Sequence, residues 1–252
     1  MSNPRRDVRF KLHRNHFSEH VDFSRTVGLE IGAFDLPLVE PHEGVCFFAD
    51  YNDATYLRRE ATRIPGHNPD FVVEIQYDLK QGYDNIPQHD WVSGSHVIEH
   101  VPDLLGWFQS LRSVLKDGGR CLLVVPDKRY IFDVHRTVSS LADVMDAHEA
   151  RRVRPSFRNV LDHHLNAVPY SASDGWAGVP PPSRPRNFQG ALALARRAEN
   201  EYVDAHCWVF TPESFQVLVE ELSFNKLLPF SLLDLRPTAP GMIDFSAVLA
   251  AQ

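Results

Sequence analysis

Val27-Gly28-Leu29-Glu30-Ile31-Gly32-Ala33-Phe34 and Trp91-Val92-Ser93-Gly94-Ser95-His96-Val97-Ile98-Glu99-His100-Val101-Pro102-Asp103 are the two stretches that decide the fold. The first is typical of a buried strand that breaks into a glycine turn. The second is typical of a strand whose last residues open onto a ligand and lead into a helix. Two such strand ends, about 60 residues apart, indicate a cofactor lying across the carboxyl ends of a parallel sheet. An enzyme is therefore the leading hypothesis.

Other short apolar runs extend this sheet along the chain. They are separated by helix-length gaps, which is typical of βαβ units and a mostly parallel sheet. We expect a doubly wound α/β fold of about seven strands with a helical insertion after strand five. The further predicted strands are 45–50, 71–76, 121–126, 232–235 and 242–249, the last two as an antiparallel edge pair.

Three helices are also expected. Residues 103–115 carry an apolar stripe at helical spacing, and Gly118-Gly119 supplies a left-handed stop. Thr211-Pro212-Glu213 opens a second helix with an N-cap, a proline at the first position and an acidic first turn. The polar residues 1–26 predict an N-terminal helix or arm laid across the sheet.

Composition narrows the class of protein. The 252 residues carry a net charge of −7, which argues against nucleic acid as the main partner because phosphate binding needs a basic face. The three cysteines, Cys46, Cys121 and Cys207, match no zinc spacing. Neither a signal peptide nor a membrane span is expected. These features together predict a cytoplasmic protein in a reducing compartment.

The segment 127–210 differs from the rest of the chain. It holds five of the 13 histidines and the proline-rich stretch Val179-Pro-Pro-Pro-Ser-Arg-Pro-Arg186. A segment of this length between strands is either a cover over the substrate or a structural elaboration. We expect a single domain over 1–252, in which 127–210 covers the acceptor site.

The turn after the first strand argues against a dinucleotide. The dinucleotide fingerprint needs three glycines, whereas only Gly32 lies in this turn, and Asp35 would face any phosphate. Glu30, inside the strand, suits a ligand that carries a cation. S-adenosylmethionine has both an ammonium and a sulfonium group.

The order of the motifs carries a family resemblance. It comprises Glu30-Ile31-Gly32-Ala33, Asp50 after a second strand, His96-Val-Ile-Glu-His-Val-Pro-Asp103 and Arg112-Ser-Val-Leu-Lys-Asp-Gly-Gly119. The chain resembles the class I S-adenosylmethionine-dependent methyltransferases. It looks most like their bacterial small-molecule branch, whose members often sit beside glycosyltransferases in polysaccharide pathways. The resemblance is specific over 27–135 and looser over 205–250.

The resemblance implies the roles of eight cofactor-binding residues. Glu30, Gly32 and Ala33 border the methionine part, together with Ser95 and His96 at the end of the fourth strand. Ribose and adenine contacts fall to three more residues: Asp50 accepts from the ribose hydroxyls, and Asp78 and Leu79 touch the adenine. The chain departs from the family at Ala33-Phe34-Asp35-Leu36, where further glycines are usual.

Histidines are the candidates for the chemistry. Methyl transfer to a hydroxyl needs a base, and histidine titrates near neutral pH; the base candidates are His100, His135 and His206. Residues of the insertion offer two alternatives, a divalent-metal site or scattered hydrogen-bonding groups without a common role. No metal site is predicted. The residues concerned are Asp133, His135, Asp162-His163-His164, Asp204 and His206.

The leading function is methyl transfer from S-adenosylmethionine to a small-molecule or glycan-like acceptor, most simply at oxygen. Arg151-Arg152-Val-Arg154, Arg184 and Arg186 would suit an anionic acceptor. One alternative is a non-catalytic methyltransferase-fold scaffold or partner subunit. The other is a nicotinamide-dependent oxidoreductase, which the missing glycines disfavour. The sequence leaves the acceptor and the oligomeric state open.

Overall fold

A computed structural model describes residues 8–252 of the chain. The chain divides into two compact units, and each is described by itself. The first comprises the chain up to Ser95, with Ser110–Leu123 and Val248–Gln252; the second comprises His96–Gln109 and Val124–Ala247. The predicted N-terminal segment 1–26 contains a helix, α1 (Val8–Ser18). Residues 1–7 of this segment lie outside the described residues.

The strands form one seven-stranded sheet in the order β3-β2-β1-β4-β5-β7-β6. The predicted α/β fold with a seven-stranded, mostly parallel sheet is confirmed. The strands are β1 (Val27–Ile31), β2 (Val45–Asp50), β3 (Tyr77–Asp78), β4 (His89–Ser95), β5 (Leu115–Pro126), β6 (Phe230–Arg236) and β7 (Asp244–Ala251).

In the first unit, β1 pairs in parallel with β2 on one side and with β4 on the other. It is buried on both faces, as its near-continuous apolar sequence requires. Trp91 of β4 is fully buried and packs edge-on against Phe23, and its indole N–H donates to Thr26. The helix α2 (Ala54–Ala61) follows β2 and is capped by Asp53.

The prediction of a strand over 71–76 is wrong. A short 3-10 helix, η1 (Pro69–Phe71), occupies its start, and the true strand β3 contains only Tyr77 and Asp78. The intervening backbone is extended, but its hydrogen bonds are isolated: the Val73 amide donates to the Phe34 carbonyl and the Gln76 amide to the Phe48 carbonyl. The Gln76 side chain, rather than a backbone carbonyl, accepts from the Phe48 amide. The ladder therefore cannot form there.

The predicted end of the 103–115 helix is also corrected. Helix α3 (Leu104–Ser113) ends earlier, and β5 begins at Leu115, so the Gly118-Gly119 pair lies in a strand. Gly118 has a φ of 71°, a conformation that serves a bulge inside a strand as well as a helix stop. The sequence signal for a left-handed glycine was right, but the element that uses it was not.

Helices dominate the second unit. The segment 127–210 is helical, as expected, and Thr211 caps the following helix through a capping box. The strands β6 and β7 are sheet neighbours joined by only seven residues, 237–243, which suits an antiparallel hairpin and not a crossover. The helices are α4 (Leu141–Glu149), α5 (Phe157–Asn166), α6 (Ala172–Trp176), α7 (Phe188–Arg197) and α8 (Pro212–Phe224).

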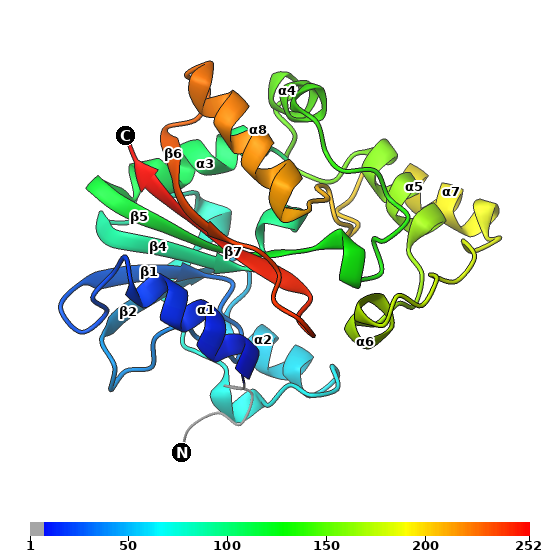
Figure 1. Cartoon of the computed structure of the whole chain (residues 1–252). Helices are drawn as coiled ribbons and strands as arrows, with labels where there is room; N and C mark the ends of the chain where they lie inside the picture. Colours follow the sequence, from blue (N-terminus) through cyan, green and yellow to red (C-terminus); the bar gives the residue numbers. More distant parts are fainter. Residues whose placement is uncertain (1–7) are drawn as a thin grey trace. The chain divides into compact units, whose positions relative to one another are not determined.

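Helices α5 and α7 lie side by side and share a small core (Figure 1). Small residues let the two backbones approach, and the same core buries the chain that leaves α7. Its buried members are Val160, Ala195, Ala198, Val203 and Ala205. This packing fixes the segment that leads directly to His206.

Within residues 8–252, no helix is long and apolar enough to cross a membrane.

Close packing at Gly28 gives a test of the sheet. A methyl group at Gly28 would lie 2.0 Å from atoms of the buried Trp91 ring. We expect Gly28→Ala to lower the free energy of unfolding by about 3 kcal/mol or more, because the ring has no room to move. Gly66→Ala serves as the control. Its methyl group would meet open space at a φ of 86°, so it should cost only about 1 kcal/mol. Equal losses in denaturant unfolding would contradict this packing.

Candidate functional site

The predicted cofactor residues of the first unit gather at the carboxyl edge of its parallel strands. In register, Ile31 of β1 lies opposite Ala49 of β2 and opposite Gly94 of β4. The next residues along the three strands, Gly32, Asp50 and Ser95, therefore leave the sheet at the same edge. Asp78 pairs with Asp50 in register and joins them there.

Gly32 makes the turn that the sequence predicted. Its φ is 69°, in the left-handed region that favours glycine, and its amide donates to the Ala49 carbonyl at 3.1 Å. Phe34 also has a positive φ, 51°. Ala33 between them is buried. The turn is thus tight without the additional glycines that are usual in the family.

Glu30 is buried at the end of β1, and one of its carboxylate oxygens, Oε2, accepts from the Leu38 amide at 2.7 Å. This bond ties the loop after the glycine turn back to the strand. A carboxylate in an apolar strand needs such partners. Its predicted role beside the methionine part of the cofactor stays a prediction.

Asp35 has a structural role. It is buried, and its two oxygens accept from the His67 ring nitrogen Nδ1 and from the Asn68 amide, both at 2.9 Å. The His67 ring also packs against Phe34 at 4.7 Å between centroids. Asp35, which stands where the family usually has glycines, therefore fixes the turn to the segment at His67 and Asn68.

Asp50 ends β2 as a half-buried carboxylate, and one oxygen accepts from the Asn52 amide at 2.8 Å. Burial raises the pKa of Asp50, and the backbone hydrogen bonds of Asn52 and Tyr51 only partly oppose this. A desolvated carboxylate with acceptor capacity left suits a pair of vicinal hydroxyls. The residue present therefore fits the ribose of S-adenosylmethionine.

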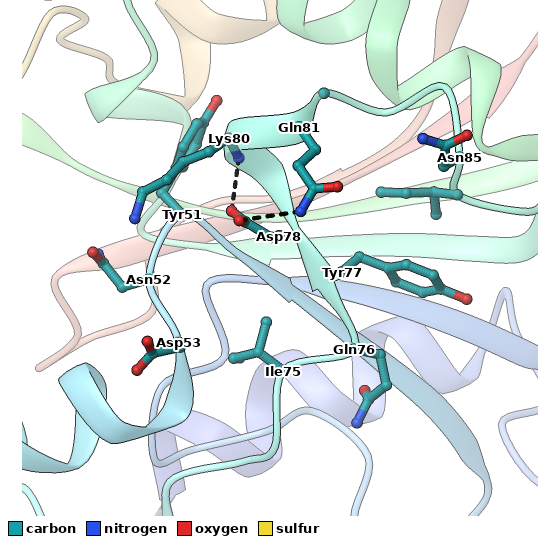
Figure 2. Close-up of a pocket in the computed structure, with 12 residues that line it drawn as sticks. Tyr51, Asn52, Asp53, Ile75, Gln76, Tyr77, Asp78, Lys80, Gln81 and Asn85 are labelled. Atoms are coloured by element: carbon teal, nitrogen blue, oxygen red, sulfur yellow. Dashed lines mark hydrogen bonds between the residues drawn. The ribbon is translucent and has the colours of Figure 1, made fainter.

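A cavity of about 300 Å³ lies beside these strand ends (Figure 2). Asp78 lines it, with its carboxylate accepting from the Lys80 amide at 2.9 Å and from the Gln81 side chain. Leu79 is buried and does not line the cavity. Tyr51 and Asn52 line the cavity from the segment after β2, and sequence reasoning missed them. Their only signal was that they follow a strand's carboxyl end.

In the second unit, His96 begins the segment that follows β4. It has a φ of 54°, and its Nε2 lies 2.8 Å from a carboxylate oxygen of Asp244. Its Nδ1 lies 3.5 Å from Glu99 Oε1. The short helix η3 (Ile98–His100) follows and carries Glu99, which sequence reasoning did not single out.

His100 is fixed by an acidic partner. Its Nδ1 lies 2.9 Å from Asp204 Oδ1. Burial opposes the charged ring, but the bond to Asp204 and the charge of Glu99 outweigh it and raise the pKa of His100. The same bond lowers the pKa of Asp204 to about 2.

His206 has the same arrangement. Its Nδ1 lies 2.5 Å from Asp133 Oδ2, and Asp133 in turn accepts from the Arg136 guanidinium at 3.0 Å. Arg136 also donates to the His206 carbonyl at 2.9 Å. The rings of His100 and His206 meet edge to face, with centroids 4.8 Å apart. Two of the three base candidates are therefore neighbours.

His163 packs beside this pair, with its Nδ1 accepting from the His206 amide at 3.3 Å. Burial lowers the pKa of His163 to about 4, so the ring is neutral near pH 7. The third base candidate, His135, is engaged elsewhere: its Nε2 lies 2.7 Å from the Pro182 carbonyl oxygen.

Two of the arginines suggested for an anionic acceptor are used structurally. Arg152 pairs with Asp146 at 2.6 Å, and Arg154 donates to the carbonyls of Ala198 and Glu199 at the end of α7. A cavity of about 470 Å³ in this unit is lined by three arginines and three aspartates and is not strongly cationic. These six residues are Arg136, Arg152, Arg158, Asp143, Asp146 and Asp162.

Comparison with known proteins identifies the family of this chain. A family model described as a methyltransferase domain matches residues 15–228. The chain therefore belongs to the methyltransferase family, as a class I S-adenosylmethionine-dependent member, and its cofactor is S-adenosylmethionine. A search of curated proteins finds no match.

Several solved structures match most of this chain at low identity. One is a methyltransferase from Methanosarcina mazei, at 15% identity with a TM-score of 0.47, covering 94% of this chain and 96% of that one. Another is a methyltransferase from Aquifex aeolicus, at 9% identity with a TM-score of 0.47, covering 99% and 94%. A third is magnesium protoporphyrin IX methyltransferase from Synechocystis PCC 6803 with bound S-adenosylhomocysteine, at 9% identity with a TM-score of 0.45, covering 97% and 82%.

The ribose assignment is tested at Asp50. We expect Asp50→Ala to weaken S-adenosylhomocysteine binding roughly tenfold to 100-fold, since hydrogen bonds to a charged group contribute about 1.5–3 kcal/mol. Calorimetry measures this directly. Asp84→Ala is the matched control, because Asp84 is an exposed aspartate that does not lie at the end of a strand. Unchanged affinity in Asp50→Ala contradicts the assignment.

The raised pKa of Asp50 predicts how binding depends on pH. The ionised carboxylate accepts from the ribose hydroxyls more strongly than the protonated acid does, so affinity is full above the pKa and falls as pH is lowered through it. Because burial raises this pKa, the fall begins at a higher pH than for an ordinary aspartate. We expect Asp50→Asn to flatten the curve in calorimetry between about pH 7 and about pH 4.5. If affinity falls equally with pH in Asp50→Asn and in the unaltered protein, the pH dependence belongs to another group.

Proposed function

We propose that this protein transfers the methyl group of S-adenosylmethionine to a hydroxyl of a small-molecule or glycan-like acceptor. Bound S-adenosylmethionine supplies an electrophilic methyl group on a sulfonium. The task left to the chain is to hold the two molecules in line and to remove the hydroxyl proton. The histidine pair, His100 with His206, is the observation that carries the proposal.

The pair has the arrangement of an oriented base. In each ring Nδ1 faces a carboxylate, Asp204 for His100 and Asp133 for His206. A carboxylate on one nitrogen fixes the ring and makes the other nitrogen more basic. Methylation of a neutral amine or a thiolate does not require this device to the same extent. A hydroxyl acceptor does, because its proton is held far more tightly.

The position of the pair in the chain supports the same role. Glu99 and His100 follow Ser95, the last residue of β4, within five residues. In parallel α/β sheets, ligands bind outside the carboxyl ends of the strands. The segment that bears His100 therefore begins at the edge where we expect the cofactor. Residues 127–210, which supply Asp133 and Asp204, are proposed to cover the acceptor.

Replacement of the pair tests the function. With tritium-labelled S-adenosylmethionine and a panel of sugar nucleotides and glycosides, we expect His206→Asn and His100→Asn to lower kcat about 100- to 10,000-fold. Affinity for S-adenosylhomocysteine should change little. His135→Asn should affect kcat much less, because its ring bonds a backbone carbonyl.

His42→Asn is the control, since that histidine is exposed on the first unit. Label transferred to amines or thiols but to no hydroxyl compound would overturn O-methylation. A protein that binds S-adenosylhomocysteine and transfers label to no acceptor class would favour the scaffold.

A further inference from the structure

Glu99 has a buried carboxylate oxygen that makes no hydrogen bond within the described residues. The residue is 1% exposed, and its Oε2 has no hydrogen-bond partner among residues 8–252. Its other oxygen lies 4.0 Å from His100 Nε2 and 3.5 Å from His96 Nδ1, both longer than a hydrogen bond. Buried carboxylate oxygens in native proteins have partners, so an unpaired one indicates a missing ligand.

One imidazole nitrogen of His100 and one of His206 lie near the Glu99 carboxylate. His100 and His206 each use Nδ1 toward a carboxylate, which leaves Nε2 of both rings for a ligand. One atom each from Glu99, His100 and His206 all lie within 4.8 Å of one another. Metal–nitrogen and metal–oxygen bonds are about 2.0–2.2 Å long, so a small inward movement allows all three atoms to bind one ion.

The surroundings have the pattern of a metal site. Histidine ligands usually bond a carboxylate through their second nitrogen, which fixes the tautomer and strengthens the ligand. Asp204 and Asp133 have this position behind His100 and His206.

The backbone holds the three residues in place. The Glu99 carbonyl accepts from the amides of Cys207 and Trp208, at 2.6 and 3.3 Å. The Trp208 indole donates to the Val101 carbonyl at 2.6 Å. Segments more than 100 residues apart in the chain are thus locked together on either side of the ligand atoms. A preorganised site requires this rigidity.

Local charge favours a dication. The carboxylates of Glu99, Asp133 and Asp204 lie around the two histidines, and Arg136 is the cation bonded to Asp133. Arg136 also pairs with Asp162, so four carboxylates face one guanidinium and leave a negative excess that favours a divalent ion. Two imidazoles and one carboxylate suit ions such as Zn²⁺, Fe²⁺, Mn²⁺ or Co²⁺.

We propose that Glu99, His100 and His206 bind a divalent transition-metal ion. Three protein ligands leave coordination positions open, as in catalytic rather than structural metal sites. Metal binding stands on this geometry alone. Its role rests on the proposed function: with the ion bound, the two rings would serve as ligands and not as the base, and an acceptor hydroxyl at an open position would become more acidic and would give its proton to solvent water as the oxygen attacks the methyl group.

Cobalt titration of the full chain tests the site without any cofactor. In protein stripped with a chelator, Co²⁺ should give a visible absorption band at a 1:1 ratio and should raise the melting temperature. Glu99→Gln and His206→Asn should abolish both effects. Asp204→Asn should weaken binding roughly 10- to 100-fold, because it removes a partner and not a ligand. His42→Asn should bind Co²⁺ as the unaltered protein does.

No band in the unaltered protein overturns the metal site, as does an equal band in Glu99→Gln. If Glu99→Gln keeps its melting temperature but loses the band, misfolding is excluded as the reason and the site is supported. Binding of S-adenosylhomocysteine and label transfer in a protein that gives no cobalt band would leave the proposed function standing while the metal site fails. A cobalt band with no label transfer to any acceptor would do the reverse.

Discussion

Parallel pairing of β1 with both β2 and β4 is the constraint on which the first unit depends. Parallel strands run in one direction, so each chain segment that leaves them emerges at the same edge. Gly32, Asp50 and Ser95 come together for this reason, although they are far apart in sequence. Burial on both faces then favours apolar residues within β1, where Glu30 is the exception and has a backbone amide as its partner.

In the second unit, the hydrogen bonds from Cys207 and Trp208 to the Glu99 carbonyl have the corresponding role. They connect the segment after β4 to the segment before α8. His206 faces His100 because of this connection, and the small core of α5 and α7 supports it from behind. Asp133 and Asp204 then orient the two rings.

Sequence reasoning succeeded where a local pattern had one physical solution. The buried strand ending in Gly32 and the capped helix at Thr211 are such cases. It failed where two solutions compete. Residues 71–76 are apolar enough for a strand, but the Gln76 side chain takes over a ladder bond. Gly118 has the expected left-handed conformation inside a strand and not at a helix end.

The sequence alone determined the α/β class, the cofactor class and the strand ends before Gly32 and at Asp50 and Ser95, because these depend on local periodicity and on connections along the chain. Only the tertiary structure decided that Glu99 joins His100 and His206, that His135 does not, and that Asp35 anchors a turn. Contacts across about 100 residues depend on packing between elements, and the spacing of residues in the chain carries no record of that packing.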